Sequence, residues 1–498
     1  MVGLARTGLA PRPRRVMRAA LLLSTALTAA TFVVAPAAAQ NATWEGDVSN
    51  SFNDGANWST GSVPSGAATA FFGTSATTSV TLAGGRTLGT IQFNSGADAY
   101  TIDINGSGTL QFNSQGIVNN SAQQQNFRLQ NAGMSFFGSS SAGNQQVTIT
   151  LDAGGQMGFA FNSTAGAANI VSNAGSIYFY DNASGGTATY TGGASSLLNI
   201  AGLTASGMTI GSIAGSGSIV ATGKAITVGG NNTTTAFGGV IAGAGGSLIK
   251  VGSGTLTLSG ANTYTGSTTI NAGTLSIASD SGLGAAGGAL NFQSGTLQVT
   301  ASTSMNRATT IAGANATFDI ASGATVVQSG TISGAGQLIK TGTGTLQLNG
   351  ANGYTGGTTV NGGTLVGTTN SLQGDIANNG TVQFNQNFNG TYAGTLSGTG
   401  NLVVVANTGS TGLTLSGTNT FSGGTTVSGI GTLTITSDAA LGAVTSGLTL
   451  QSLGTLVFGS SFNLASTRAI SIGSGGGRIS TNGFDTTISQ SINGPGGL

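Results

Sequence analysis

One stretch of this sequence occurs three times along the chain. It reads TLTLSGANTYTGSTTINAGTL at residues 255–275, returns as TLQLNGANGYTGGTTVNGGTL at 345–365, and returns again at 412–433 with one residue inserted. Internal repetition at intervals of tens of residues is the signature of architectures in which each unit stacks on its neighbours. The sequence therefore favours a long repeat array over a set of globular domains.

Apolar and polar residues alternate inside each copy. Leu256 and Leu258 share one parity, as do Leu275 and Ile277, and threonine and serine fill the positions between them. A period of two residues is typical of a strand with one buried face. Glycine and asparagine follow after about five to eight residues, so each copy is predicted to form short strands joined by tight turns. The repeated anchor positions are Leu256, Leu346, Leu413, Tyr264, Tyr354 and Phe421.

The composition argues for an ordered β structure. Disordered chains combine low hydrophobicity with high net charge and abundant proline. This chain of 498 residues has 88 glycines, only 5% charged residues and positive mean hydropathy, and its only prolines after residue 39 are Pro64 and Pro495. Scarce proline suits a backbone whose N–H groups are needed for sheet hydrogen bonds.

The residues that the sequence lacks limit its chemistry. It contains no cysteine and no histidine, which excludes disulfide bonds and every site built on a thiolate or an imidazole. Five of the 13 basic residues lie before position 19, so the remainder carries eight basic and 12 acidic residues, a net charge of −4. A weakly acidic surface without a basic cluster argues against nucleic acid as a partner. We expect no metal and no cofactor.

Residues 1–39 have the pattern of a signal peptide. An arginine-rich start precedes a mostly apolar run at 19–34, and three alanines ending at Ala39 fit the small residues of a cleavage site before Gln40. The run is shorter than the roughly 20 residues of a membrane-spanning helix, so export is favoured over an anchor. An arginine pair in the charged start leaves the general and the twin-arginine export routes both open.

Residues 40–128 are predicted to form an N-terminal cap and the first coils. Trp44, Phe52, Trp58, Phe71 and Phe72 gather near the start of the mature chain. The end of a stacked array exposes a strand edge and a section of core, which needs a cap. An aromatic platform for carbohydrate is the alternative interpretation of these residues.

Residues 129–241 show the coil length directly. Three similar triplets begin at Asn131, Asp152 and Asn173, at intervals of 21 residues, and each leads into an aromatic segment. We predict a β-solenoid with about 21–22 residues per coil, in which these three side chains stack at one corner and the aromatic residues form a ladder. Neighbouring coils are expected about 4.8 Å apart.

Residues 242–498 carry the long repeats. Tyr264, Tyr354 and Phe421 mark the same position in the three copies, and we interpret the two intervals between them as four and three coils. The copies are therefore expected several coils apart, without mutual contact. The final residues, GPGGL, match the positions at which earlier copies begin, so we expect the chain to stop at the start of a fourth copy and to continue in a longer protein.

Two catalytic motifs are interpreted as structural. Residues 282–287 fit the dinucleotide pattern G-x-G-x-x-G, but they lead into a predicted strand in place of the required helix, so we predict a turn. Ser247 and Lys250 fit the S-x-x-K pattern of serine–lysine hydrolases. The second copy keeps the lysine, as Lys340, but has Gln337 in the position of the serine. The lysine therefore belongs to the repeat.

The acidic residues are few and mostly solitary. The closest pairs are Glu45 with Asp47 and Asp98 with Asp103. Hydrolysis of a glycosidic bond needs two carboxyl groups about 5–9.5 Å apart across the substrate. We therefore predict no enzymatic activity, with a polysaccharide hydrolase or lyase built on a β-helix as the alternative.

The segment at 334–365, GAGQLIKTGTGTLQLNGANGYTGGTTVNGGTL, resembles the passenger-associated transport repeat of Gram-negative autotransporters, also called the autotransporter-associated β-strand repeat. The resemblance is close in two copies and looser in the third, where Val404 replaces the lysine. It extends over residues 242–498, and the segment at 57–72 is similar to the start of many such passengers.

This resemblance implies a right-handed parallel β-helix that is exported through the inner membrane to the cell surface or the extracellular medium. It implies delivery by a C-terminal β-barrel translocator in the outer membrane, which we expect beyond residue 498. The predicted function is adhesion, autoaggregation or surface display, with a host or neighbouring cell surface as partner. An inert stalk that presents another domain is a further alternative.

Overall fold

The computed structural model describes residues 39–406 and 411–498, so the predicted signal segment lies outside the described residues except for Ala39. Residues 40–498 form one compact unit. The named strands pair in parallel. Helical structure in the described part of the chain is limited to three 3₁₀ turns, η1 (Gly55–Asn57), η2 (Asp280–Leu283) and η3 (Asp438–Leu441). The predicted all-β parallel solenoid is confirmed.

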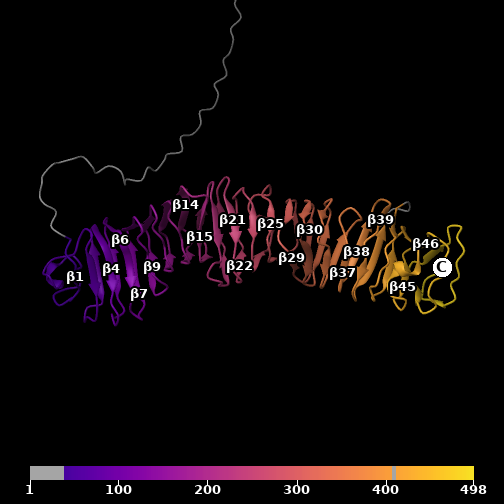
Figure 1. Cartoon of the computed structure of the whole chain (residues 1–498), viewed down its shortest axis with the longest axis horizontal. Coiled ribbons are helices and arrows are strands. Elements are labelled where there is room, and N and C mark those ends of the chain that lie inside the picture. The colour runs from indigo at the N-terminus through magenta and orange to yellow at the C-terminus, as the bar shows by residue number, and fades with distance from the viewer. Residues whose placement is uncertain (1–38, 407–410) are drawn as a thin grey trace, which may run out of the picture. The chain divides into compact units, whose positions relative to one another are not determined.

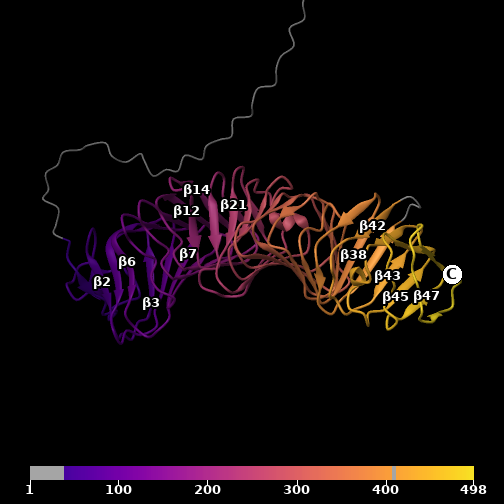
Figure 2. The same ribbon diagram turned by 45° about the vertical axis from the view of Figure 1, so that its right-hand side comes forward.

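In the described residues five sheets make up the column, and each takes its name from its first and last strand. Figures 1 and 2 show their strands following one another in sequence order, from indigo to yellow. The β1–β20 sheet contains β1 (Ala42–Thr43), β2 (Thr69–Phe72), β4 (Arg86–Phe93), β6 (Thr109–Asn119), β8 (Gly133–Phe136), β10 (Gln156–Phe159), β12 (Ser176–Asp181), β14 (Leu197–Leu203), β17 (Ser218–Val220) and β20 (Val240–Ala242).

The longest sheet runs beside the first one and continues past it. This β3–β40 sheet contains β3 (Ser79–Ala83), β5 (Thr101–Asn105), β7 (Gln125–Gln130), β9 (Val147–Leu151), β11 (Asn169–Ser172), β13 (Thr189–Gly192), β16 (Ser212–Gly215), β19 (Thr235–Phe237), β22 (Thr255–Leu258), β24 (Thr274–Ile277), β26 (Thr296–Val299), β29 (Asn315–Ile320), β32 (Gln337–Thr341), β35 (Thr358–Val360), β37 (Ile376–Asn378) and β40 (Leu396–Ser397).

Three further sheets complete the coils. The β15–β34 sheet contains β15 (Gly207–Ile210), β18 (Ala225–Val228), β21 (Ser247–Lys250), β23 (Thr268–Ile270), β25 (Leu290–Phe292), β28 (Thr309–Ile311), β31 (Ile332–Gly334) and β34 (Gly353–Tyr354). The β27–β49 sheet contains β27 (Thr303–Met305), β30 (Thr325–Gln328), β33 (Thr345–Leu348), β36 (Thr364–Gly367), β38 (Thr381–Gln386), β41 (Asn401–Ala406), β43 (Thr425–Ser428), β45 (Leu448–Gln451), β47 (Ile470–Ile472) and β49 (Ile492–Asn493). The β39–β48 sheet contains β39 (Gly390–Tyr392), β42 (Gly412–Leu415), β44 (Thr432–Ile435), β46 (Gly454–Phe458) and β48 (Gly477–Ser480).

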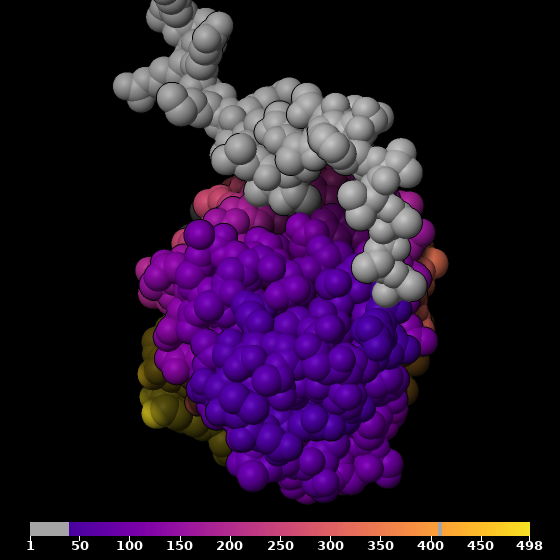
Figure 3. All heavy atoms as spheres, turned by 90° about the vertical axis from the view of Figure 1, so that its left-hand side faces the viewer, coloured from indigo at the N-terminus to yellow at the C-terminus, as the bar shows by residue number. Residues whose placement is uncertain are grey.

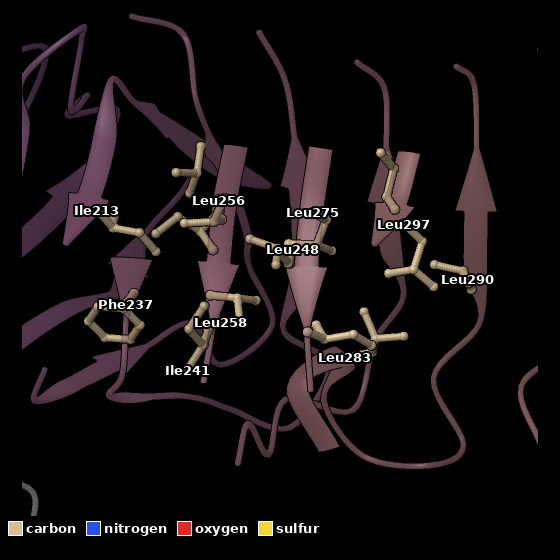
Figure 4. Close-up of a cluster of buried hydrophobic side chains, with 14 of the residues drawn as sticks. Ile213, Phe237, Ile241, Leu248, Leu256, Leu258, Leu275, Leu283, Leu290 and Leu297 are labelled. Atoms are coloured by element: carbon tan, nitrogen blue, oxygen red, sulfur yellow. The ribbon is translucent and has the colours of Figure 1, made fainter. Parts of the chain in front are cut away.

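Like residues lie above one another in successive coils. Leu256 pairs with Leu275, Leu275 with Leu297, and Leu297 with Phe318. The sequence separation of each pair is close to the predicted coil length. Alternate residues of most strands face inward and are buried, and Figure 4 shows Leu256, Leu275 and Leu297 following one another in this core. Each such side chain contributes about 1.5–3 kcal/mol when it is buried.

The aromatic residues near the start of the column are buried. Trp44 and Trp58 are 1% and 2% exposed, and their ring centroids lie 5.3 Å apart in an edge-to-face arrangement. Phe52 and Phe72 pack against Trp58 at 4.8 and 5.9 Å. Figure 3 views this end of the column, where the indigo surface shows no deep hollow. Neither tryptophan ring is available as a platform for carbohydrate.

Candidate functional site

Each copy of the long repeat begins on a different sheet. Leu248 of the first copy lies on β21 in the β15–β34 sheet, and Leu338 of the second lies on β32 in the β3–β40 sheet. Leu402 of the third lies on β41 in the β27–β49 sheet. The next strand of each copy, β22, β33 and β42, lies on the next sheet around the coil. Successive copies are therefore turned by one face about the column.

The pairing register explains this turn. Following the paired residues from Leu248 through four coils leads to Ile332, which lies six residues before Leu338, the equivalent of Leu248 in the second copy. Three coils from Leu338 lead to Leu396, again six residues before Leu402. The prediction that the copies lie several coils apart is confirmed. Our interpretation of the spacing as a whole number of coils is wrong. Each interval is six residues, or about a third of a coil, longer than four or three whole coils.

On the third face of each copy, an asparagine side chain bridges two neighbouring segments of backbone. Asn262 accepts a hydrogen bond from the Ile241 N–H at 2.8 Å and donates to the Gly282 carbonyl at 2.7 Å. Asn352 makes the same two bonds at 2.8 and 2.8 Å, and Asn419 at 2.8 and 2.7 Å. All three asparagines are buried. Each side-chain amide thus satisfies one backbone N–H and one backbone carbonyl, as a peptide group of a strand would.

A buried aromatic residue follows each bridging asparagine by two positions. The Tyr264 hydroxyl lies 2.6 Å from Thr268 Oγ1, and the Tyr354 hydroxyl lies 2.8 Å from Thr358 Oγ1. Burial raises the pKa of Tyr264 to about 12. The third copy has Phe421 in this position, which has no hydroxyl. The Oγ1 atom of Thr425 is therefore buried without a hydrogen-bond partner among the described residues.

Replacing Phe421 by Tyr is expected to stabilise the coils around the third copy by about 1 kcal/mol, because the new hydroxyl would supply the partner that Thr425 lacks. The matched change, Tyr354→Phe, is expected to destabilise the second copy by a similar amount. Urea unfolding, combined with local amide hydrogen exchange, measures both changes. Loss of stability in Phe421→Tyr would show that the third site cannot accommodate a hydroxyl.

The lysines of the first two copies are buried inside the corner that follows their strand. Lys250 Nζ donates to the carbonyls of Val251 and Gly252 at 2.7 and 2.9 Å. Lys340 Nζ donates to Thr341 and Gly342 at 2.6 and 2.9 Å. Both lysines also reach a carbonyl of the next coil at 3.3 Å. Each ammonium group therefore satisfies carbonyls from two coils.

Lys340 is expected to make stability depend on pH above neutrality. Burial lowers its pKa to about 8, although nearby Asp319 opposes the shift. Between pH 8 and the ordinary value of 10.5 the unfolded chain holds the proton and the folded chain releases it, so stability rises with pH. The urea midpoint of the wild type should therefore increase relative to Lys340→Met from pH 7 to pH 10. A constant difference between the two proteins would contradict this prediction.

The family model of the passenger-associated transport repeat matches residues 248–277, 338–366 and 405–435. The chain carries three passenger-associated transport repeats. A 179-residue stretch is 33% identical to the Adhesin BmaC autotransporter of Brucella suis biovar 1 (strain 1330), covering 31% of this chain and 5% of the relative. The chain thus spans a small part of that relative's length. No solved structure matches the chain.

A buried arginine holds the turn that follows the first and the third transport repeats. Arg307 donates from Nε and Nη2 to the carboxylate of Asp280 at 2.6 and 3.0 Å, and its Nη1 donates to the Ala285 carbonyl at 2.7 Å. Arg468 makes both bonds to the carboxylate of Asp438 at 2.9 Å. The arginine side chains are 1% and 0% exposed.

Sequence reasoning missed both arginines. Each lies about one coil beyond its aspartate, 27 residues for Arg307 and 30 for Arg468. The available signal was the pair Ser-Asp at 279–280 and 437–438, where two of the few charged residues occupy the same position after a transport repeat. An aspartate that recurs at the same position of a repeat, in a chain with so few charged residues, indicates a basic partner for its carboxylate.

Of the three side chains predicted to stack at one corner, Asp152 and Asn173 are in contact, whereas Asn131 is out of register with Asp152 and bonds to the backbone of the following residue, Ala153. The Asp152 carboxylate accepts a hydrogen bond from Asn173 Nδ2 at 2.8 Å and pairs with Arg128 at 2.7 Å, and both contacts lower its pKa. Asn131 adopts a positive φ of 49° in the turn below. The neighbouring Gln130, whose amide lies 3.4 Å from the carboxylate, contacts Asp152 on that side.

Four phenylalanine rings form an aromatic ladder inside the column. The centroids of Phe112, Phe136, Phe159 and Phe179 are successively 5.0, 4.8 and 4.7 Å apart, and their planes are nearly parallel. The predicted ladder is confirmed, and Phe112 extends it by one coil. Other aromatic residues of these coils face outward, including Phe161, which is 57% exposed and has a φ of 59°.

The remaining candidate residues have structural contacts. Asp98 accepts a hydrogen bond from the Ser75 N–H at 3.0 Å, and Asp103 pairs in register with Arg128. Residues 282–287 lie in and directly after η2, so the predicted turn is confirmed. In the described part of the chain no three acidic residues gather into a potential metal site. Within residues 39–406 and 411–498 no helix has the length and apolar character needed to cross a membrane.

Proposed function

We propose that this chain belongs to an autotransporter passenger, exported to the surface of a Gram-negative cell, whose β-solenoid acts in adhesion and autoaggregation. The observation that carries the proposal is the set of three transport repeats, which form part of the continuous coil stack. The name of the relative, an adhesin autotransporter, supports the same role. The proposed partners are an outer-membrane translocator and the surface of a host or neighbouring cell.

The outer faces of the column support an adhesive role. Thr255, Thr274, Thr296 and Thr317 pair in register on four successive strands of the β3–β40 sheet. Their hydroxyl groups form a column at the spacing of the coils, about 4.8 Å. Such columns offer many neutral hydrogen-bonding groups to another surface. The aspartates of the described ion pairs serve the fold, which supports a role without catalysis.

Expression of the full-length gene product in a non-adherent bacterium tests the proposal. Cells that display the protein are expected to sediment as aggregates and to bind cultured epithelial cells. A version in which residues 248–435 are replaced by coils of an unrelated β-solenoid should reach the surface, as detected by antibody, and lose adhesion. Equal adhesion by both versions would show that these coils act only as a stalk.

A further inference from the structure

A polar hollow of about 450 Å³ opens beside the second transport repeat. Its lining includes carboxamide side chains from three segments of the chain and one aromatic ring, and none of its described lining residues is charged. The residues that carry the argument are Gln347, Asn349, Asn370, Asn385, Asn387 and Phe388.

The hollow spans three coils. Gln347 on β33 pairs with Val366 on β36, and Val366 pairs with Gln383 on β38. Asn349 and Asn385 lie two residues beyond the first and the last of these positions. Two coil steps separate them, so the hollow extends about 10 Å along the column. This length suits a ligand of one or two sugar rings.

The turn after the second transport repeat differs from the other two. The segment from Leu275 to Leu290 in the first copy has the same length as the equivalent segment of the third copy, between the leucines at 433 and 448. The equivalent segment of the second copy, from Leu365 to Ile376, is shorter. The 3₁₀ turn and its Arg–Asp pair are absent from this described segment, and Thr368 and Asn370 of the shorter loop line the hollow.

The amides of the hollow have free hydrogen-bonding groups. Gln347 Nε2 donates a hydrogen bond to Asn349 Oδ1 at 3.0 Å. The amino group of Asn349 has no hydrogen-bond partner among the described residues. The side-chain amides of Asn370, Asn385 and Asn387 have no hydrogen-bond partner among the residues that the structure describes. Each carboxamide presents two donors and an acceptor, which matches the hydroxyl groups of a sugar.

We propose that this hollow binds a neutral saccharide of a cell-surface glycan. The amides bond the hydroxyl groups, and the Phe388 ring packs against the apolar C–H face of the sugar. The lack of charge in the lining favours neutral over acidic sugars, and the lack of a lining carboxylate suits binding without hydrolysis. This inference rests on the proposed adhesive function and names the ligand class for it.

Saturation-transfer NMR on the purified chain tests the site with lactose, cellobiose and N,N′-diacetylchitobiose as neutral probes and glucuronic acid as the acidic probe. At least one neutral disaccharide is expected to bind, and glucuronic acid is not. Asn385→Leu and Phe388→Ala should each weaken binding at least tenfold. Phe161→Ala, which removes an exposed ring elsewhere on the column, should leave binding unchanged.

The variants separate the possible failures. No binding of any neutral probe, unchanged binding in both hollow variants, or loss of binding in Phe161→Ala would overturn the proposed site. Asn385→Leu keeps the number and branching of the side-chain heavy atoms while it removes the carboxamide, and an unchanged urea midpoint shows that its effect is on binding. If displayed wild-type cells adhere and Asn385→Leu/Phe388→Ala cells adhere equally, the site is wrong and the adhesive function stands. If the purified chain binds a neutral sugar but displayed cells do not adhere, the adhesive function is wrong.

Discussion

Replacing Arg307 by Met is expected to destabilise the coils around the first transport repeat by about 3–5 kcal/mol. The change leaves the carboxylate of Asp280 without its bidentate partner, and it leaves the Ala285 and Gly288 carbonyls without their donor. The Arg307 side chain is 1% exposed and that of Asp280 is 19% exposed, so water can replace only some of these bonds. Local unfolding of residues 279–288 should therefore become much more frequent.

Amide hydrogen exchange at residues 279–311 and the urea midpoint measure this loss, since a long repeat array need not unfold as one cooperative unit. Arg128→Met is the matched control, because it also removes an Arg–Asp pair but its side chain is 52% exposed. An exposed pair contributes little to stability, because water screens the two charges. An equal loss of stability in Arg307→Met and Arg128→Met would contradict the expectation that a buried ion pair contributes more to stability than an exposed one.

Replacing Phe159 by Ala is expected to destabilise the aromatic ladder by about 3–5 kcal/mol, because it leaves a cavity in a closely packed core. The Phe159 ring is fully buried between Phe136 and Phe179, at 4.8 and 4.7 Å. Each coil contacts mainly its neighbours, so the loss should concentrate in the coils at residues 133–181 and weaken at greater distance.

Hydrogen exchange across the column measures how far the effect of Phe159→Ala extends. Phe161→Ala, two residues further on, removes a ring that is 57% exposed and should change stability by less than about 0.5 kcal/mol. Uniform loss of protection along the whole column after Phe159→Ala would contradict the picture of coils that are stabilised by their neighbours.

The local pattern of the sequence was sufficient to predict the strands, the coil and the ladder. Alternation around Leu256 and Leu258 defines a strand with one buried face, and the regular interval between Asn131, Asp152 and Asn173 defines the coil. Both signals are contained in short lengths of sequence. Stacking then follows, because a repeated pattern places Leu256 and Leu275 above one another.

The polar hollow was not predictable from its residues. Gln347, Asn349 and Asn385 lie on strands of different coils or directly after them, and asparagine is common throughout this chain. The sequence shows the shorter turn after the second transport repeat, at 365–376, but it does not show which side chains the turn brings together. The pairing of β33, β36 and β38 provides that information.

The sequence by itself determined that this protein is a parallel stack of short strands, because its alternation and its regular coil interval are local properties. The tertiary structure decided that successive transport repeats face different directions, since a six-residue excess in the spacing becomes a turn only when coils are counted in register. It also decided the partners of Asn262 and Arg307. Those partners come from neighbouring coils, and hydrogen bonds between coils depend on a register that no single segment contains.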